Sequence, residues 1–137
     1  QMRRVAIAGI FALNPDIIVL DEPTVGLDPK GKEELMKLLT NIHETTNKTI
    51  IMISHDMDIV GKYAKRIMVM DKGNLVYDGP KRKLFEDIET LHSLNLDLPT
   101  SAYLATELKK KGLINYTHLP LCKEELETVI LGGDVNE

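Results

Sequence analysis

Two short apolar runs, at residues 17–20 and 49–54, form the clearest pattern along the chain. Both are continuous and rich in β-branched residues, which is typical of strands buried on both faces of a parallel sheet. Periodicity alone does not exclude a buried helix for such a run. Prolines at positions 15 and 23, however, confine the first run to the length of a strand. We therefore predict two parallel strands that are buried on both faces.

Apolar residues recur at helical spacing in the segments around these runs. This pattern predicts helices over residues 1–13, from Asp28-Pro29 onward, and over residues 56–64. Aspartate followed by proline is a typical helix start, because the carboxylate caps the first turn and proline suits the first helical position. The residues predicted to face inward in the second and third helices are Leu35, Leu38, Leu39, Ile42, Met57, Val60 and Ala64.

A β-hairpin is predicted next, because apolar segments at residues 67–70 and 75–77 flank a polar turn. The methionines on the predicted strands, Met52, Met68 and Met70, are assigned to the core. The order of elements up to this point is that of an α/β domain in which helices pack on a parallel sheet.

The chain changes character after residue 79, where a Gly-Pro pair is followed by short helical patterns. We predict helices over residues 81–85, 101–111 and 123–131, with Gly112 as the glycine that ends the second one. The run Lys81-Arg82-Lys83 is interpreted as the charged face of a helix. We accordingly divide the chain into an α/β core, residues 1–79, and a small helical appendix, residues 80–137.

Composition and charge narrow the classes of function. The 137 residues are 43% hydrophobic and carry a net charge of −4, whereas a nucleic-acid-binding domain is usually basic. No apolar run approaches the ~20 residues that span a bilayer, so membrane association would run through a partner. The single cysteine, Cys122, rules out an internal disulfide and fits a reducing cytosol. It follows His118 at helical spacing, but no second pair completes a metal site, and we favour a solvated loop.

Adjacent carboxylates, Asp21 and Glu22, lie where the first predicted strand ends. Ligands of open α/β sheets gather at this edge. Phosphoryl transfer needs a metal on the phosphate oxygens and a positioned nucleophile, and two neighbouring carboxylates can serve these two needs. The second strand ends at His55, so His55 and Glu22 should converge on one edge of the sheet, where a histidine can contact a terminal phosphate. Taken alone, each motif has a simpler interpretation. Asp21 and Glu22 would cap a surface turn, and His55 would be a surface histidine after a strand.

The combined motifs give a specific resemblance. The text IIVLDEPTVGLDP, followed by a helix and IIMISHD, resembles the ABC ATPase family, and Gln1-Met2-Arg3-Arg4 resembles the end of its LSGGQ signature and the text after it. The resemblance implies an α/β fold that is part of a P-loop NTPase core of the RecA-like ABC type. It also implies a chain that begins at the last residue of the signature, and hence a truncated one.

This resemblance implies roles for particular residues. Asp21 would be the Walker B aspartate that holds Mg²⁺ through water, and Glu22 would be the catalytic base. His55 would be the switch histidine and Asp28 the D-loop aspartate. Gln1 and Arg4, at the start of the first helix, would face the γ-phosphate of ATP bound by the opposite subunit.

A narrower resemblance links the chain to one group of importers. The text Ala8-Gly9-Ile10-Phe11-Ala12 and the segment around residues 96–112 look like the energy-coupling-factor ATPases, which include the cobalt and nickel importers. This implies a peripheral ATPase at the cytoplasmic face of the membrane that works with a second ABC ATPase subunit and a transmembrane permease or coupling subunit, and binds no nucleic acid. The main alternative is an ABC-superfamily ATPase that acts in DNA maintenance. The transporter-like Gly-Leu-Asp-Pro loop and the acidic net charge of the chain argue against this alternative.

A false phosphate loop must be separated from these motifs. Gly26 and Gly31-Lys32 match most of the Walker A pattern, but Glu33 stands where Ser or Thr should be. Pro29 lacks an N–H group, and the acidic side chains would repel phosphate. We interpret the segment as a loop and a helix start. Since no other segment matches, the chain by itself is expected to be a half-domain that does not turn over ATP.

Overall fold

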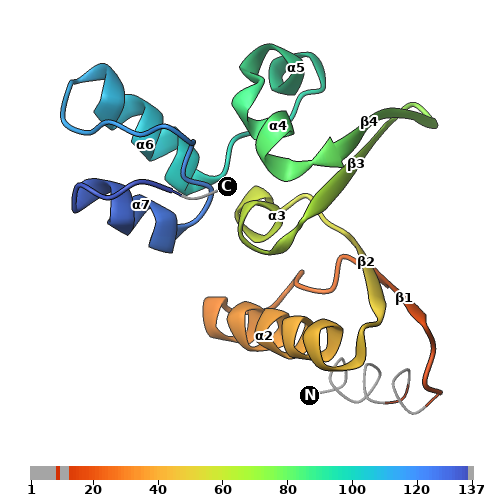
Figure 1. Ribbon diagram of the computed structural model, residues 1–137. Helices are drawn as coiled ribbons and strands as arrows, with labels where there is room; N and C mark the ends of the chain where they lie inside the picture. Colours follow the sequence, from red (N-terminus) through yellow and green to blue (C-terminus); the bar gives the residue numbers. More distant parts are fainter. Residues whose placement is uncertain (1–8, 10–12, 136–137) are drawn as a thin grey trace. The chain divides into compact units, whose positions relative to one another are not determined.

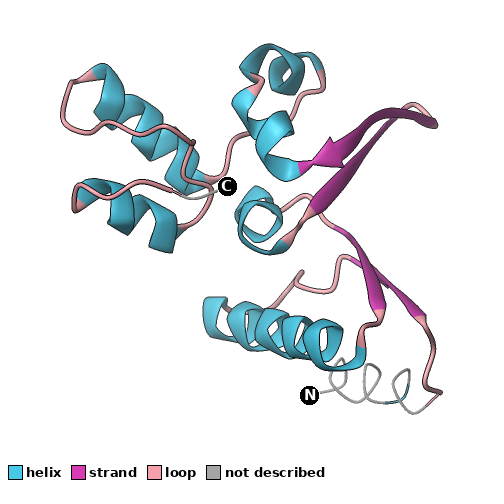
Figure 2. Ribbon diagram, viewed as in Figure 1, coloured by secondary structure: helices cyan, strands magenta, loops and turns pink. Residues whose placement is uncertain are grey.

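The computed structural model describes residue 9 and residues 13–135 of the 137-residue chain. Strands and helices alternate and are followed by a run of helices (Figures 1 and 2). In chain order the elements are β1 (Ile17–Asp21), α2 (Pro29–Thr46), β2 (Thr49–Ile53), α3 (Met57–Tyr63), β3 (Arg66–Asp71), β4 (Asn74–Pro80), α4 (Lys81–Glu86), α5 (Ile88–Ser93), α6 (Thr100–Lys110) and α7 (Lys123–Ile130). The predicted helix over residues 1–13 lies almost entirely outside the described residues.

The chain forms two compact units, which divide between His55 and Asp56. This division differs from the change in sequence character at residue 79, because the β3–β4 hairpin clusters with the helices that follow it. The assignment of residues 1–79 and 80–137 to core and appendix therefore stays a prediction about function, and the two units are described separately below.

The first unit contains a parallel pair of strands, β1 and β2, joined through α2. The pairing runs from Ile17 opposite Thr49 to Asp21 opposite Ile53, without a break in register. Asp28 caps α2 through a hydrogen bond that its Oδ1 accepts from the Gly31 amide (2.8 Å), which confirms the predicted start. A Cβ on residue 31 would lie 2.7 Å from that oxygen, so a larger residue there would displace the capping carboxylate.

The prediction that these strands are buried on both faces is wrong for the described residues. Ile18 and Leu20 are buried, whereas Ile17 and Val19 are 60% and 58% exposed. The described residues cover one face only, where α2 packs against the strands (Figure 1). The buried stripe of α2 also differs from the predicted one, because Met36 is buried in place of Leu38. Successive positions on a helix are about 100° apart, so Met36 and Leu38 flank Leu35 and Leu39 on opposite sides, and the buried stripe is shifted toward Met36.

The second unit opens with α3 and the β3–β4 hairpin, whose strands pair in antiparallel fashion with an irregularity between Val69 and Met70. Val69 packs toward the core, but the assignment of Met68 and Met70 to the core is wrong, since they are 52% and 63% exposed. They lie on the hairpin face opposite the core, because successive side chains of a strand point to opposite faces. Met52, on β2 of the first unit, is half-buried.

The core of the second unit is formed by helix and loop residues that pack around an almost inaccessible phenylalanine, Phe85. Its buried members are Leu84, Phe85, Leu91, Ala102, Leu119 and Leu121. Gly112 ends α6 in the left-handed conformation (φ +69°), as predicted, with its amide bonded to the Lys109 carbonyl. Helix α5 was not predicted, because its short, polar sequence has little periodicity.

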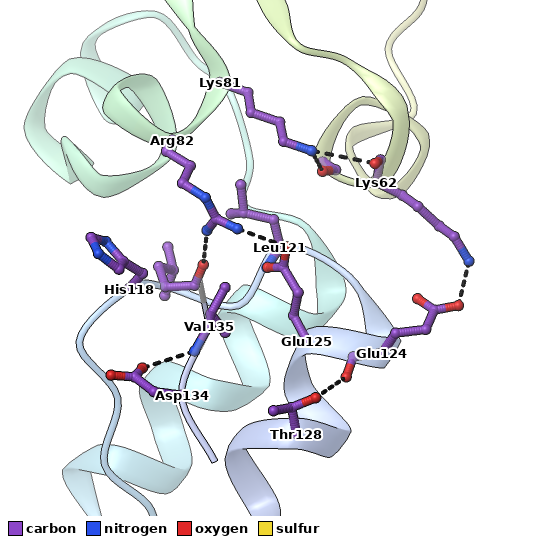
Figure 3. A network of polar contacts seen from close by, with 12 residues as sticks. Lys62, Lys81, Arg82, His118, Leu121, Glu124, Glu125, Thr128, Asp134 and Val135 are labelled. Atoms are coloured by element: carbon purple, nitrogen blue, oxygen red, sulfur yellow. Dashed lines mark hydrogen bonds and ion pairs between the residues drawn. The ribbon is translucent and has the colours of Figure 1, made fainter. Parts of the chain in front are cut away.

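The run Lys81-Arg82-Lys83 is not simply a charged surface. Arg82 bonds both the Leu119 carbonyl (3.1 Å) and the Glu125 carboxylate (2.7 Å), and so ties α4 to α7 (Figure 3). Lys81 donates to the Gly61 carbonyl (2.6 Å) at the end of α3. Burial lowers the pKa of the Lys81 ammonium. The interpretation of this run as a charged helix face holds for the exposed Lys83 but is wrong for Lys81 and Arg82, because their partners come from distant segments that local spacing cannot show.

Candidate functional site

The ends of β1 and β2 bring together the residues that the motifs single out. Asp21 pairs with Ile53, so Glu22 and His55 follow directly at the carboxyl edge of the sheet. The ladder continues one step further, because the Glu22 amide donates to the Ile53 carbonyl (3.0 Å). This register fixes the backbone from which both side chains project.

Glu22 and His55 are in direct contact. The Nδ1 atom of His55 lies 2.6 Å from Oε1 of Glu22, although the residues are 33 positions apart. The predicted convergence is therefore confirmed. The His55 side chain is 80% exposed and that of Glu22 is 33% exposed, so the imidazole is open to a ligand while the carboxylate is partly shielded.

The second carboxylate oxygen of Glu22 is different. Oε2 is buried and has no hydrogen-bond partner among the described residues. Buried polar oxygens nearly always have a partner, and an exception indicates an unfilled functional role. One oxygen of Glu22 is thus occupied by His55, and the other is available as an acceptor.

The backbone of Glu22 is strained. Its φ angle is +44°, in the left-handed region that a residue with a Cβ rarely adopts. Such conformations cost about 1–3 kcal/mol and concentrate at functional sites. The loop that follows is held by turns, in which the Val25 amide donates to the Glu22 carbonyl (3.2 Å) and Gly26 also has a positive φ. The fold therefore maintains an unfavourable backbone conformation at the residue that carries the carboxylate.

Asp21 is exposed at the end of β1. Proteins often hold Mg²⁺ through one or two carboxylates, with phosphate oxygens and waters completing the shell. A single exposed carboxylate beside Glu22 fits that role. No group of three or more His, Cys, Asp or Glu side chains in the described part of the chain could hold a metal unaided.

Asp28 is placed as the cap of α2, so its Oδ1 serves the helix. The segment 26–32 forms a turn and the start of α2, in agreement with its interpretation as a loop and helix start rather than a phosphate loop. The role of Asp28 toward nucleotide stays a prediction. Gln1 and Arg4 lie outside the described residues.

A buried lysine joins β1 and β2 at the strand ends opposite the site, in a way that the sequence did not indicate. Lys48, 9% exposed, donates from Nζ to the Pro15 carbonyl (2.6 Å), while its own carbonyl contacts Nδ1 of His43 (2.8 Å). These bonds join the start of β2 to the start of β1. A lysine between a helix and a strand is usually predicted to be exposed to solvent, so no local pattern identifies the contact of Lys48 with Pro15.

Comparison with known proteins finds similarity to the ATP-binding proteins of transporters. Residues 2–61 match a family model described as "AAA domain, putative AbiEii toxin, Type IV TA system", which covers fewer than half of the residues. The energy-coupling factor transporter ATP-binding protein EcfA2 of Ligilactobacillus salivarius is 43% identical over 140 residues, which cover 100% of this chain and 48% of that protein. EcfA2 of Acetivibrio thermocellus is 48% identical over 111 residues, covering 81% of this chain and 40% of that protein.

Solved structures show the same relationship. The chain resembles cbiO1 from Clostridium perfringens, part of the ABC transporter complex cbiONQ, with 41% identity and a TM-score of 0.58 over 75% of this chain and 41% of that one. It also resembles a dimeric ATP-binding cassette in a post-hydrolysis state bound to ADP and Pi, with 36% identity and a TM-score of 0.55 over 60% of this chain and 35% of that one. The chain spans about half the length of the curated relatives it matches.

Proposed function

Because the chain belongs to the ABC transporter ATPase family, we propose that it is part of a subunit that hydrolyses MgATP and thereby drives solute uptake. The proposal extends to an importer of the energy-coupling-factor type, for cobalt, nickel or a vitamin. The similarity to EcfA2 proteins and to cbiO1 supports this subtype. The solute itself would be selected by membrane partners.

The two oxygens of Glu22 carry the proposed mechanism. Oε1 is held by His55, and Oε2 is buried without a partner among the described residues. A water placed at Oε2 could donate a proton to Glu22 while its oxygen attacks the γ-phosphorus. The bond between this phosphorus and the leaving oxygen of ADP then breaks. A carboxylate at this position is suited to accept the proton of an attacking water.

His55 and Asp21 would serve the phosphates. The exposed imidazole of His55, anchored through Nδ1, can present its other nitrogen to a terminal phosphate oxygen. Asp21 would hold Mg²⁺ through water, and the ion would neutralise charge on the phosphate oxygens. Asp28, Gln1 and Arg4 are proposed to act on nucleotide at the interface with a second ATPase subunit. The dimeric cassette to which the chain is similar supports such an arrangement.

We further propose that the protein works at the cytoplasmic face of the membrane with a permease or coupling subunit. None of the described helices has the length and apolar character needed to cross a bilayer. The 137 residues contain no phosphate-binding loop of the Walker A type, so this chain alone should bind MgATP weakly and should not hydrolyse it. Calorimetry of the chain with MgATP tests this point, and micromolar binding would contradict it.

Glu22→Gln in the full-length protein tests the mechanism. We expect loss of at least about 100-fold in turnover, since general base catalysis contributes this much or more, with ATP binding preserved. Glu44→Gln, on the exposed side of α2, is the matched control and should hydrolyse ATP normally. Undiminished hydrolysis by Glu22→Gln would refute the assignment. Copurification with DNA instead of a membrane permease would favour the DNA-maintenance alternative.

A further inference from the structure

Helix α3 begins two residues after His55 and is bound by several later segments of the second unit. Its Asp58 carboxylate accepts two hydrogen bonds from Thr100, at the first residue of α6. The Thr100 amide lies 2.6 Å from Oδ1, and the Thr100 hydroxyl lies 2.8 Å from Oδ2. Asp58 and Thr100 are 42 positions apart, so this contact is tertiary.

Asp58 replaces a cap that α6 does not have. The N-cap position of α6 is Pro99, whose side chain makes no capping bond. The first amides of a helix need acceptors from outside the helix, and a carboxylate near this end also suits the helix dipole. The start of α6 is therefore satisfied by α3 and not by its own neighbours.

The other end of α3 is held as well. Gly61 lies so close to the following segments that a Cβ there would be 2.7 Å from the Leu121 carbonyl oxygen and 2.7 Å from Cγ of Pro99. Lys81 bonds the Gly61 and Lys62 carbonyls, and Lys62 pairs with Glu124 of α7 (Figure 3). The helical segments of the second unit thus fix α3 at its start and at its end.

The backbone that leaves the candidate site runs directly into this helix. Asp56, the residue after His55, is the N-cap of α3, and its carboxylate accepts from the Ile59 amide (3.3 Å). Asp56 is the single residue between His55 and Met57, the first residue of α3. A shift of the first turn of α3 would therefore move the chain at His55.

We propose that Asp58 is a positioning residue for His55, through which the helices after residue 80 influence ATP hydrolysis. This inference rests on the proposed function of the Glu22–His55 pair. Asp58 does not touch that pair, and its effect passes through α3 and Asp56. The helical segments beyond the hairpin therefore affect the rate of ATP hydrolysis as well as the stability of the protein.

The test compares two aspartate–threonine contacts of the same chemistry in the full-length protein. Asp87 accepts from the Thr90 amide (3.0 Å) and hydroxyl (2.6 Å), but caps α5 locally and not α3. Asp58→Ala should lower kcat about two- to thirtyfold, the range for coupling carried by packed elements, with little change in KM for ATP. Asp87→Ala, with a similar loss of thermal stability, should keep the wild-type kcat. Thr100→Ala is the milder variant should Asp58→Ala fold poorly, and it should lower kcat in the same direction.

A double-mutant cycle with His55→Ala separates positioning from a general loss of stability. If Asp58 acts through His55, Asp58→Ala should have no further effect on the residual kcat of His55→Ala. An equal fold-loss in both backgrounds, or equal effects of Asp58→Ala and Asp87→Ala, would overturn the inference. Failure of the proposed function gives a different result, namely hydrolysis that is unaffected by Glu22→Gln or His55→Ala.

Discussion

The two units of the chain differ in how they bury apolar surface. In the first unit, β1 exposes Ile17 and Val19 on one face of its sheet. In the second unit, Phe85 and Leu121 are almost fully enclosed by helices and by the hairpin. The first unit carries the Glu22–His55 pair, so the candidate chemistry lies in the unit whose described residues cover the sheet on one face only.

This difference has a physical consequence for stability. Parallel strands normally have both faces covered, and a sheet of two strands is marginal by itself. A closed cluster of helix and hairpin side chains, in contrast, gains about 25 cal/mol for each Å² of apolar surface removed from water. We therefore expect the second unit to resist local unfolding better than the first, and amide hydrogen exchange should report this order.

Truncation of the second unit's central side chain should give the largest effect. Phe85→Ala should lower the free energy of unfolding of this unit by about 3–5 kcal/mol, through lost burial and an unfilled cavity. Val19→Ala, on the exposed face of β1, should cost less than about 1 kcal/mol. Hydrogen exchange resolved by unit measures both changes. Similar costs for the two variants would show that the first unit has a cover of its own and would remove the contrast.

Two helical glycines sharpen the comparison at intermediate size. Gly61→Ala should destabilise the second unit by about 1–3 kcal/mol, because the new Cβ would press on the Leu121 carbonyl and the buried Pro99 ring. In the first unit, a Cβ at Gly31 would meet the end of the Asp28 side chain, which can rotate away. A gain of up to ~1 kcal/mol in helix propensity then offsets the weakened cap. Urea unfolding of both variants measures these changes in the free energy of unfolding. An unchanged stability of Gly61→Ala would contradict the close approach of the Leu121 carbonyl to residue 61.

The smallest effect concerns acid stability of the second unit. The Lys62 ammonium, bonded to Glu124, lowers the pKa of that carboxyl to about 2. Because the folded-state pKa is depressed, the stabilisation is complete above the unfolded value of ~4.3 and is lost as the pH falls toward 2. The pair is partly exposed, so solvent screening keeps the increment small.

Urea midpoints of the wild type and of Glu124→Gln measure this increment between pH 7 and pH 2. Their difference should be constant down to about pH 5 and should then shrink, following the titration of the unfolded carboxyl. Lys62→Met should remove the same pH-dependent difference. A difference that persists unchanged at pH 2 would show that Glu124 stabilises α7 by means other than its charge.

Much of the candidate site could be predicted from the sequence. The motif around Asp21 and Glu22, the histidine after the next strand and the α/β order suffice to place Glu22 and His55 at one edge of a sheet, and the contact confirms this convergence. The reason is that parallel pairing forces strand ends together. The turn at segment 26–32 could also be predicted, because proline and aspartate have strong local preferences.

Other features could not be predicted, because they depend on segments far apart in the chain. Nothing local shows that Met68 and Met70 face away from the core, or that Lys81 and Arg82 bind carbonyls of α3 and of the segment before α7. A periodic pattern reports which residues are apolar, but it does not report what covers them.

The sequence by itself determined the family, the strand and helix order around the candidate site and the convergence of Glu22 with His55, because these depend on local chemistry and on motif spacing. Only the tertiary structure decided three other features: the strained φ of Glu22, the unpartnered Oε2 and the two bonds by which Asp58 caps α6. Each of these depends on the exact approach of backbone segments in space. Distances of this kind are set by packing and hydrogen bonding across the whole unit, and no single stretch of the sequence encodes them.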